Sequence, residues 1–518
     1  MAEGRKPPSM RIGHPIVASA IVFIGSFCTL VIELIAGRIM APYIGVSLYT
    51  WTSIIGVTLA GISFGNYAGG WLADRMASRG VLGTLFIISG LVSLAILPLT
   101  GFIVDLNLDR SWPLMVRIVV YTGLIFFAPT FVLGMISPVV VKLSLSDLSR
   151  TGSIVGRIYA FSTVGSIAGT FATGFYLIEA MGTRQIVWTV SAILILVGLI
   201  VGQYWRGVAR GATAILLVGA FTAFYQMRAD FAGPCLRESS YYCIRVSTAI
   251  VEGIEVSSLV LDHLVHSYVS LDNPKFIGYG YERVYNEITE WHAAQRPRFA
   301  TLSIGGGGYT FPKFVAAQYP FSENDVLEID PAVTEAAHDF LGLPRDGRIR
   351  THNQDARIWY IENRPVDRFD LVYGDAFNDI SVPYHLTTRE FDQMVKTSMR
   401  SDGILMTNII DNYHSGDFLR AYLKTLDEVF GNVYLFGFGR AWEGSGPSTY
   451  VAVASPQPLD IANFAQFEGF MATRAKYSAV LDSSTLRQYL AQGRQIVLSD
   501  DYAPVDNLVA RLFVERGF

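Results

Sequence analysis

The chain has 518 residues, more than one ordinary domain requires, so we expect two or more domains. Apolar residues make up 51% of it and charged residues only 16%, with a mean hydropathy of +0.35, whereas roughly 25% of the residues in soluble domains are charged. The net charge of −4 and a pI near 6.1 give no basic surface for nucleic acid, so we expect no nucleic-acid partner.

The apolar excess is concentrated between Pro15 and about Tyr225. Crossing a lipid bilayer takes roughly 20 apolar residues in a helix. Seven runs reach about that length, near residues 15–36, 50–72, 81–103, 115–141, 155–180, 185–203 and 211–227. We therefore predict an α-helical, polytopic membrane domain over residues 1–230, with about seven spans in a cell membrane.

The basic residues of the short connecting segments are unevenly shared between the two sides. The side that includes the N-terminus carries Arg5, Lys6, Arg11, Arg75, Arg79, Lys142, Arg150, Arg157, Arg206 and Arg210. The other side carries Arg38, Arg110 and Arg184, with Arg117 near a membrane boundary. Because basic loops stay in the cytoplasm, the N-terminus is expected there. Seven spans would then place the residues after about 228 outside.

Two cysteines follow the last predicted span, Cys235 and Cys243, and a third, Cys28, lies within the first span. A spacing of eight residues can close a small disulfide loop in an oxidising compartment. We expect that disulfide, with two unpaired thiols as the alternative. Two cysteines are too few for a structural zinc site.

The connection between the second and third predicted spans contains the segment Gly65–Arg75, rich in small residues and ending in Asp74-Arg75. It is similar to a cytoplasmic loop of major facilitator transporters. Small residues also recur at Gly165 and Gly169, where we expect a helix-packing face.

The second half alternates strands and helices. Residues 252–268 predict a β-hairpin or a small sheet, and residues 281–292 predict a helix. Strands then begin near 299, 325, 348 and 369, with helices expected near 311–319, 332–341 and 355–362. This order predicts a linker and β-region over 231–298, followed at 299–518 by a Rossmann-like, doubly wound parallel sheet that binds its ligand at the strands' carboxyl ends.

Those strand ends carry glycines or polar side chains. The first leads into Gly305–Gly308, the second into Glu328 and Asp330, the third into Asp355, and the fourth into Asp375. Glycines let the backbone approach a ligand, and a carboxylate on the second strand can bind ribose hydroxyls. We therefore predict a nucleoside-containing ligand. Asp330 precedes Pro331 and is better explained as a helix cap.

This half resembles the spermidine synthase family of aminopropyltransferases from Leu259 to about Ser455. The matching motifs are Leu259-Val-Leu-Asp262, Tyr285-Asn-Glu287, Ile304–Gly307, Leu327-Glu-Ile-Asp330, Asp355 and Asp375. Fusion to membrane spans is similar to a membrane-bound bacterial subgroup of that family.

The resemblance implies transfer of an aminopropyl group from decarboxylated S-adenosylmethionine to putrescine or a related amine, with no metal or separate cofactor and with a homodimer possible. It assigns Asp375 as the catalytic residue and places the acceptor amine at Tyr285 and Asp379. The donor would be bound by Gly305, Gly306, Gly307, Gly308, Asn286, Glu328, Asp355 and Ala356.

The chain also departs from the family pattern. Gly308 stands where the family has an aspartate, Ala356 replaces a glycine, and Asp379 is displaced by one residue. An S-adenosylmethionine-dependent transferase with another acceptor, and a polyamine or nucleoside transporter or sensor without turnover, therefore stay open. His263 and His266 would point to different faces of a strand, so we expect no metal site there.

The predicted orientation conflicts with the predicted chemistry. Sulfonium nucleosides are made in the cytoplasm, whereas seven spans place the α/β domain outside. Either the donor crosses the membrane, or the number of spans is even.

Overall fold

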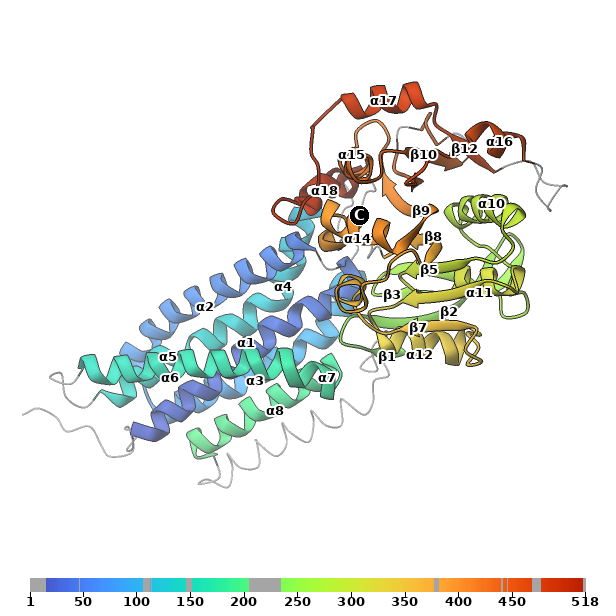
Figure 1. Ribbon diagram of the computed structural model, residues 1–518. Helices are drawn as coiled ribbons and strands as arrows, with labels where there is room; N and C mark the ends of the chain where they lie inside the picture. The colour runs from blue at the N-terminus through green and yellow to red at the C-terminus, as the bar shows by residue number, and fades with distance from the viewer. Residues whose placement is uncertain are drawn as a thin grey trace, which may run out of the picture. The chain divides into compact units, whose positions relative to one another are not determined.

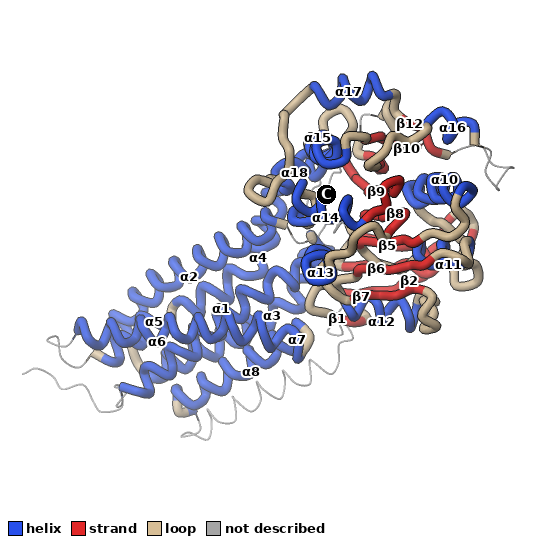
Figure 2. Tube along the Cα trace, in the orientation of Figure 1, coloured by secondary structure: helices blue, strands red, loops and turns tan. Residues whose placement is uncertain are grey.

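The computed structural model describes residues 15–45, 47–105, 112, 114–145, 151–204, 234–376, 382–438, 441–444, 446–467 and 477–515. The chain divides into two compact units, Met1–Tyr242 and Cys243–Phe518. The first unit is mainly helical, and the second contains every strand of the two β-sheets except β1, Arg237–Glu238 (Figures 1 and 2).

In the described part of the first unit, six helical segments are long and apolar enough to cross a membrane. Helices α4 and α5 together make the fourth segment, and α6, a π-helical turn and α7 make the fifth. The bounds are α1 Pro15–Ile44, α2 Leu48–Met76, α3 Arg79–Asp105, α4 Leu114–Gly134, α5 Ile136–Ser144, α6 Thr151–Ala172, α7 Ile178–Ala180 and α8 Thr183–Gly202. The seventh predicted run, at 211–227, lies outside the described residues.

Glycines bring these helices into backbone contact. A Cβ atom added at Gly65 of α2 would lie 2.1 Å from the carbonyl oxygen of Phe131 in α4. One added at Gly169 of α6 would lie 2.5 Å from the carbonyl oxygen of Phe27 in α1. No larger residue fits at such distances, so small residues determine which helices pair. The predicted packing role of Gly165 and Gly169 is confirmed.

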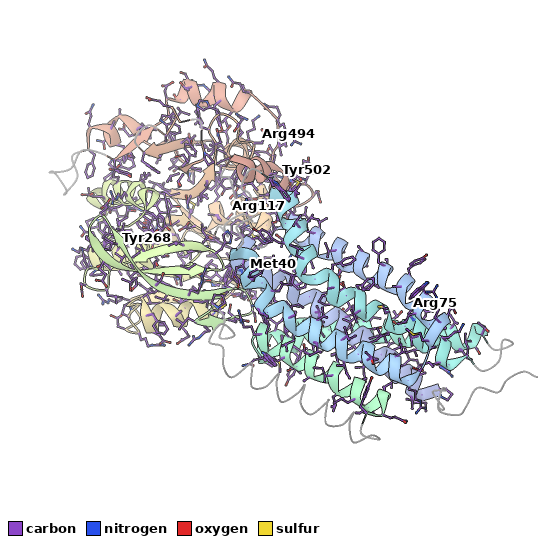
Figure 3. The ribbon with its side chains drawn as sticks, turned by 180° about the vertical axis from the view of Figure 1, so that it is seen from behind. Met40, Arg75, Arg117, Tyr268, Arg494 and Tyr502 are labelled. Carbon is purple, nitrogen blue, oxygen red and sulfur yellow. The ribbon has the colours of Figure 1, made fainter. Side chains whose placement is uncertain are left out.

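The segment Gly65–Arg75, predicted as a connection between two spans, lies inside α2, and Asp74 and Arg75 belong to the last turn of that helix. Asp74 forms an ion pair with Lys142 of α5 at 2.6 Å, and the Arg75 guanidinium lies 3.8 Å from the centre of the Trp71 ring (Figure 3). The carboxylate therefore joins the ends of two neighbouring helices.

Cys235 and Cys243 are both disulfide-bonded, and Cys28 is a buried free thiol. Since the chain has three cysteines, the predicted small disulfide loop is confirmed.

The smaller sheet has the order β1-β2-β3-β4. Its strands are β1 Arg237–Glu238, β2 Cys243–Val251, β3 Ile254–Leu261 and β4 Leu264–Val269, and both β2–β3 and β3–β4 are antiparallel. The turn between β2 and β3 holds Glu252 and Gly253 at φ of +52° and +80°, the left-handed conformation that tight hairpins require. The hairpin predicted over residues 252–268 is present as β3 and β4, which turn at Asp262 and His263.

The larger sheet has eight strands in the order β12-β10-β11-β9-β8-β5-β6-β7. The five strands from β9 to β7 are parallel, as predicted, whereas β11, β10 and β12 are antiparallel to their neighbours. The strands are β5 Ala300–Ile304, β6 Glu323–Leu327, β7 Ile349–His352, β8 Phe369–Gly374, β9 Met399–Asp411, β10 Val433–Phe438, β11 Ser448–Ala454 and β12 Ser478–Val480. The helices are α10 Gly280–Gln295, α11 Thr310–Gln318, α12 Pro331–Phe340, α13 Ala356–Asn363, α14 Arg389–Ser398, α15 Phe418–Phe430, α16 Ile461–Gln466, α17 Ser483–Ala491 and α18 Val505–Glu515.

Helices cover both faces of this sheet. Met406 of β9 packs in one apolar cluster with Tyr281 and Tyr285 of α10, whereas the next residue, Thr407, reaches the Tyr422 hydroxyl of α15 at 3.4 Å. Successive residues of a strand point to opposite faces, so α10 and α15 lie on opposite sides. The strand order reverses between β5 and β8, and the carboxyl ends of strands at such a point form the usual ligand crevice of open α/β sheets.

Candidate active site

The loop after β5 passes close to the end of β8. Gly305 has a φ of +101°, and a Cβ atom there would lie 2.4 Å from the carbonyl oxygen of Asp375. Its N–H donates to the carbonyl of Leu327 at 2.9 Å. Gly307 also has a positive φ, +49°. The glycines are therefore required by the close approach of three strand ends and by the backbone conformation.

Glu328 ties this loop to β6. Its Oε2 atom accepts hydrogen bonds from the N–H groups of Gly306 and Gly307 at 2.9 and 3.0 Å, and Oε1 accepts from the N–H of Asp330 at 3.0 Å. The residue is 6% exposed, and burial raises its pKa. A carboxylate offers about four acceptor positions, so three are used by the backbone and about one is left for a ligand hydroxyl.

The position of Gly308 explains the missing family carboxylate. Its N–H donates to the Ser267 hydroxyl of β4 at 2.8 Å. A Cβ atom added at Gly308 would lie 2.6 Å from Ser267 Cβ and 3.2 Å from Val269 Cγ2. Strand β4 therefore occupies the space that an aspartate side chain would need.

Asp375 follows β8 and is held on both carboxyl oxygens. Oδ2 accepts from the Tyr281 hydroxyl at 2.7 Å, and Oδ1 accepts from Nδ2 of Asn408 at 3.0 Å. The residue is half-buried, and burial raises its pKa to about 6. An oriented carboxylate that ionises near neutral pH can accept a proton from a reacting group.

Aromatic rings and a second acid surround this carboxyl. The rings of Tyr268, Tyr279, Tyr281 and Tyr285 follow one another with centroid separations of 5.1, 5.6 and 5.5 Å; Tyr268 is labelled in Figure 3. Burial, and then the charge of Asp375, raises the pKa of Glu282 to about 8. Glu282 is therefore mainly protonated near neutral pH, and the negative charge of Asp375 and the ring faces together favour a cationic ligand.

Asp355 caps the helix that follows β7. Its Oδ1 atom accepts from the N–H of Ile358 at 3.0 Å, and its Oδ2 atom lies 2.9 Å from Nε2 of His385. The hydrogen bond from His385 lowers the pKa of Asp355. Ala356 is the first residue of α13 and is buried. Asp330 likewise caps α12 through the N–H of Ala332, as predicted.

The other predicted residues lie as follows. Tyr285 is 1% exposed and donates to the carbonyl of Gly374 at 3.0 Å. Asn286 accepts from the Tyr319 hydroxyl at 3.2 Å, just beyond the end of α11 that is remote from the glycine loop. Asp379 lies outside the described residues. The structure thus brings together the glycine loop, Glu328 and Asp375, and it occupies Tyr285 and Asn286 with bonds inside the protein.

Sequence reasoning missed Tyr281 and Asn408, the two residues that hold Asp375. Tyr281 lies four residues before Tyr285 on α10, so it shares a helical face with a residue that the motif had already singled out. Asn408 lies on β9, which follows the last of the four strands predicted from the sequence.

No family model matches the chain. The chain is 36% identical over 137 residues to a polyamine aminopropyltransferase of Vibrio vulnificus, covering 26% of this chain and 44% of the relative. It is 28% identical over 134 residues to a probable polyamine aminopropyl transferase of Bifidobacterium longum, covering 26% and 29%. It is also 31% identical over 122 residues to the human eEF1A lysine and N-terminal methyltransferase, covering 21% and 17%.

Among solved structures, a probable spermidine synthase from Corynebacterium glutamicum aligns with a TM-score of 0.45 and 18% identity, covering 52% of this chain and 97% of that one. The chain spans less than half the length of these three curated relatives. By sequence, a segment of about 135 residues is similar to polyamine aminopropyltransferases.

Proposed function

We propose that the protein is a membrane-bound aminopropyltransferase that moves the aminopropyl group of decarboxylated S-adenosylmethionine to putrescine or a related amine. The observation that carries this proposal is Asp375, held by Tyr281 and Asn408 beside the glycine loop. Its carboxyl lies where a nucleoside on the loop and an amine would meet.

The reaction needs positioning more than bond activation, because the sulfonium carries its own leaving group. The neutral amine nitrogen attacks the carbon attached to sulfur, and the new N–C bond forms as the C–S bond breaks. The bonding pair stays on sulfur, which leaves as the neutral thioether 5′-methylthioadenosine. The product nitrogen then gives its extra proton to the Asp375 carboxylate. Fixing nitrogen, carbon and sulfur in line supplies most of the acceleration.

Two acceptor atoms have the capacity to hold these substrates. Oδ1 of Asn408 is buried and has no hydrogen-bond partner among the described residues, so it can accept an N–H of the incoming amine while Nδ2 holds Asp375. Glu328 has about one acceptor position left for a ribose hydroxyl. Each would be satisfied by the ligand proposed for it.

The test is incubation of the purified full-length protein with each sulfonium donor and a panel of amines, read by mass spectrometry. The proposal expects an amine heavier by one aminopropyl group together with 5′-methylthioadenosine, from the decarboxylated donor only. The Asp346→Asn variant, which alters a surface pair with Arg348, is the matched control and should keep full activity. Absence of aminopropylated product across the panel would reject the proposal.

A transferase that uses S-adenosylmethionine itself is the second candidate, and the geometry at Gly308 favours it. A carboxylate at position 308 would attract the aminopropyl ammonium of the decarboxylated donor and would repel the carboxylate of S-adenosylmethionine. Ser267 leaves no room for a side chain at this position, so this repulsion is absent. The same incubation separates the two candidates, because methylated product from S-adenosylmethionine would support this one.

A transporter or sensor without turnover is the third candidate. A cavity of about 150 Å³ in the helical unit is lined by polar side chains from four helical segments, including Ser26, Asn66, Ser137, Ser162 and Ser166. Polar groups converging inside a membrane bundle are a usual mark of a solute site. Uptake of labelled amine into vesicles, lost in Asn66→Leu and without any product, would favour this candidate.

A further inference from the structure

A second buried carboxyl lies on the other face of the sheet from the carboxyl of Asp375. Asp392 of α14 is 1% exposed and lines a cavity of about 30 Å³ that also touches Gly374 and Ala376, the residues on either side of Asp375. Thr407 lines this cavity, whereas its neighbour Asn408 holds Asp375. Successive strand residues point to opposite faces, so the two carboxyls flank the end of β8.

The hydrogen bonding of Asp392 is incomplete. Oδ1 accepts one long bond from the Tyr422 hydroxyl at 3.4 Å, and Oδ2 has no partner among the described residues. Burial raises the pKa of Asp392 well above its ordinary value. A buried polar atom without a partner destabilises a protein, and such atoms are rare in native structures unless a ligand or water satisfies them.

The size and lining of the cavity limit what can occupy it. A single water needs roughly 10–15 Å³ of such volume, so the cavity holds a group of one or two non-hydrogen atoms. Its walls are mostly apolar, formed by residues such as Ile304, Leu386, Phe391 and Leu405, and three hydroxyl side chains, Thr387, Thr407 and Tyr422, also line it. These hydroxyls have hydrogen bonds inside the protein, whereas Oδ2 of Asp392 has none among the described residues, so the cavity favours an N–H or O–H donor directed at Oδ2.

We propose that Asp392 and this cavity form a second carboxyl subsite, which binds an amino group of a substrate beside the reaction centre. This inference rests on the proposed function for the identity of the substrates. Two sources supply such a group: the exocyclic amino group of the donor's adenine and the far amino group of the acceptor. In both cases the bond is an N–H donated to Oδ2.

The experiment uses two variants of the full-length protein. Asp392→Leu removes the acceptor oxygens and fills the cavity, whereas Asp392→Asn keeps a carbonyl oxygen. We expect Asp392→Leu to weaken substrate binding about tenfold, equal to about 1.4 kcal/mol, and Asp392→Asn to stay within about threefold of the wild type. We also expect Asp392→Leu to raise the thermal unfolding midpoint, because it replaces an unsatisfied buried acid by an apolar group.

Calorimetric titration distinguishes the two sources. If adenine supplies the amino group, Asp392→Leu weakens binding of 5′-methylthioadenosine but not of 5′-methylthioinosine, which lacks that group. If the acceptor supplies it, the variant weakens binding of 1,4-diaminobutane but not of 1-aminobutane.

Unchanged affinities for all four ligands, or a lowered unfolding midpoint with unchanged affinities, would overturn the inference and leave Asp392 a structural residue. Titration does not require turnover. A wild type that binds these ligands without forming product therefore rejects the proposed reaction alone, whereas normal turnover with unaffected binding in Asp392→Leu rejects the second subsite alone.

Discussion

Substituting Gly308 by alanine tests why this loop carries no side chain at its fourth position. The φ of Gly308 lies outside the left-handed region, so alanine adopts the backbone conformation without strain. The consequence is steric, because the new methyl group would lie 2.6 Å from Ser267 Cβ and 3.2 Å from Val269 Cγ2.

The magnitude follows from that overlap. Carbon atoms pack at roughly 3.5–4.0 Å, so one contact is too short by about 1 Å and the loop or β4 must move. Overpacking of this kind costs about 1–3 kcal/mol. Movement also weakens the bond from the Gly308 N–H to the Ser267 hydroxyl, worth about 1 kcal/mol. We expect Gly308→Ala to destabilise the α/β domain by about 2–4 kcal/mol and to weaken nucleoside binding.

Thermal unfolding of the purified protein, followed together with titration of 5′-methylthioadenosine, measures both effects. Ser267→Gly removes both the obstructing Cβ atom and the hydroxyl that accepts the Gly308 N–H, so the effect of Gly308→Ala is compared in the wild-type and Ser267→Gly backgrounds. We expect Gly308→Ala to cost clearly less in the Ser267→Gly background. An equal cost in both backgrounds would refute the explanation, as would a Gly308→Ala variant with wild-type stability.

Three further predictions concern the carboxylates. Tyr281→Phe removes a hydrogen bond that favours the charged form of Asp375, so the rate should fall about tenfold and the acidic limb of the pH–rate profile should move to higher pH. In the wild type, the acidic limb should lie near pH 6, the raised pKa of Asp375. Activity should rise with pH through this value, because the deprotonated carboxylate accepts the proton. A limb near pH 4 would argue against Asp375 as the base. Glu328→Gln loses at least one acceptor for the loop N–H groups, so titration should show nucleoside binding weakened about tenfold. Unchanged affinity would mean that the loop keeps its shape without this carboxylate.

Much of the α/β domain follows from local sequence. Alternating strands and helices predicted the parallel part of the sheet, and glycines after an apolar strand predicted the loop that passes the end of β8. The Asp330-Pro331 pair predicted a helix cap. In each case the determining residues are adjacent in the chain, so periodicity and capping rules apply directly.

The residues that sequence reasoning missed depend on contacts between distant segments. Tyr281 and Asn408 lie 94 and 33 residues from Asp375, and the bonds to that carboxyl appear only once α10 and β9 are packed on β8. Ser267 likewise explains Gly308 from 41 residues away. The antiparallel strands β10, β11 and β12 carry no local signal of direction, because strand direction is fixed by pairing in the sheet.

In the helical half, too, some features follow from local sequence and others do not. Hydropathy predicted the six described helical segments that are long and apolar enough to cross a membrane, and the spacing of Gly165 and Gly169 predicted a packing face. The side of the membrane on which the α/β domain lies depends on the predicted run at 211–227, so it stays a prediction. A reporter fused to the C-terminus is expected to be active outside the cell if that run crosses the membrane, and in the cytoplasm if it does not.

The most direct test of the central claim is a comparison of the wild type with Asp375→Asn in the aminopropyl-transfer assay. The new amide can accept from Nδ2 of Asn408 with its oxygen and donate to the Tyr281 hydroxyl with its nitrogen, so the site should keep its hydrogen bonds and leave Oδ1 of Asn408 to the amine. We expect the rate of product formation to fall about 100- to 10,000-fold, with 5′-methylthioadenosine bound within about threefold of the wild-type affinity. A variant that forms product at the wild-type rate would contradict the role given to Asp375.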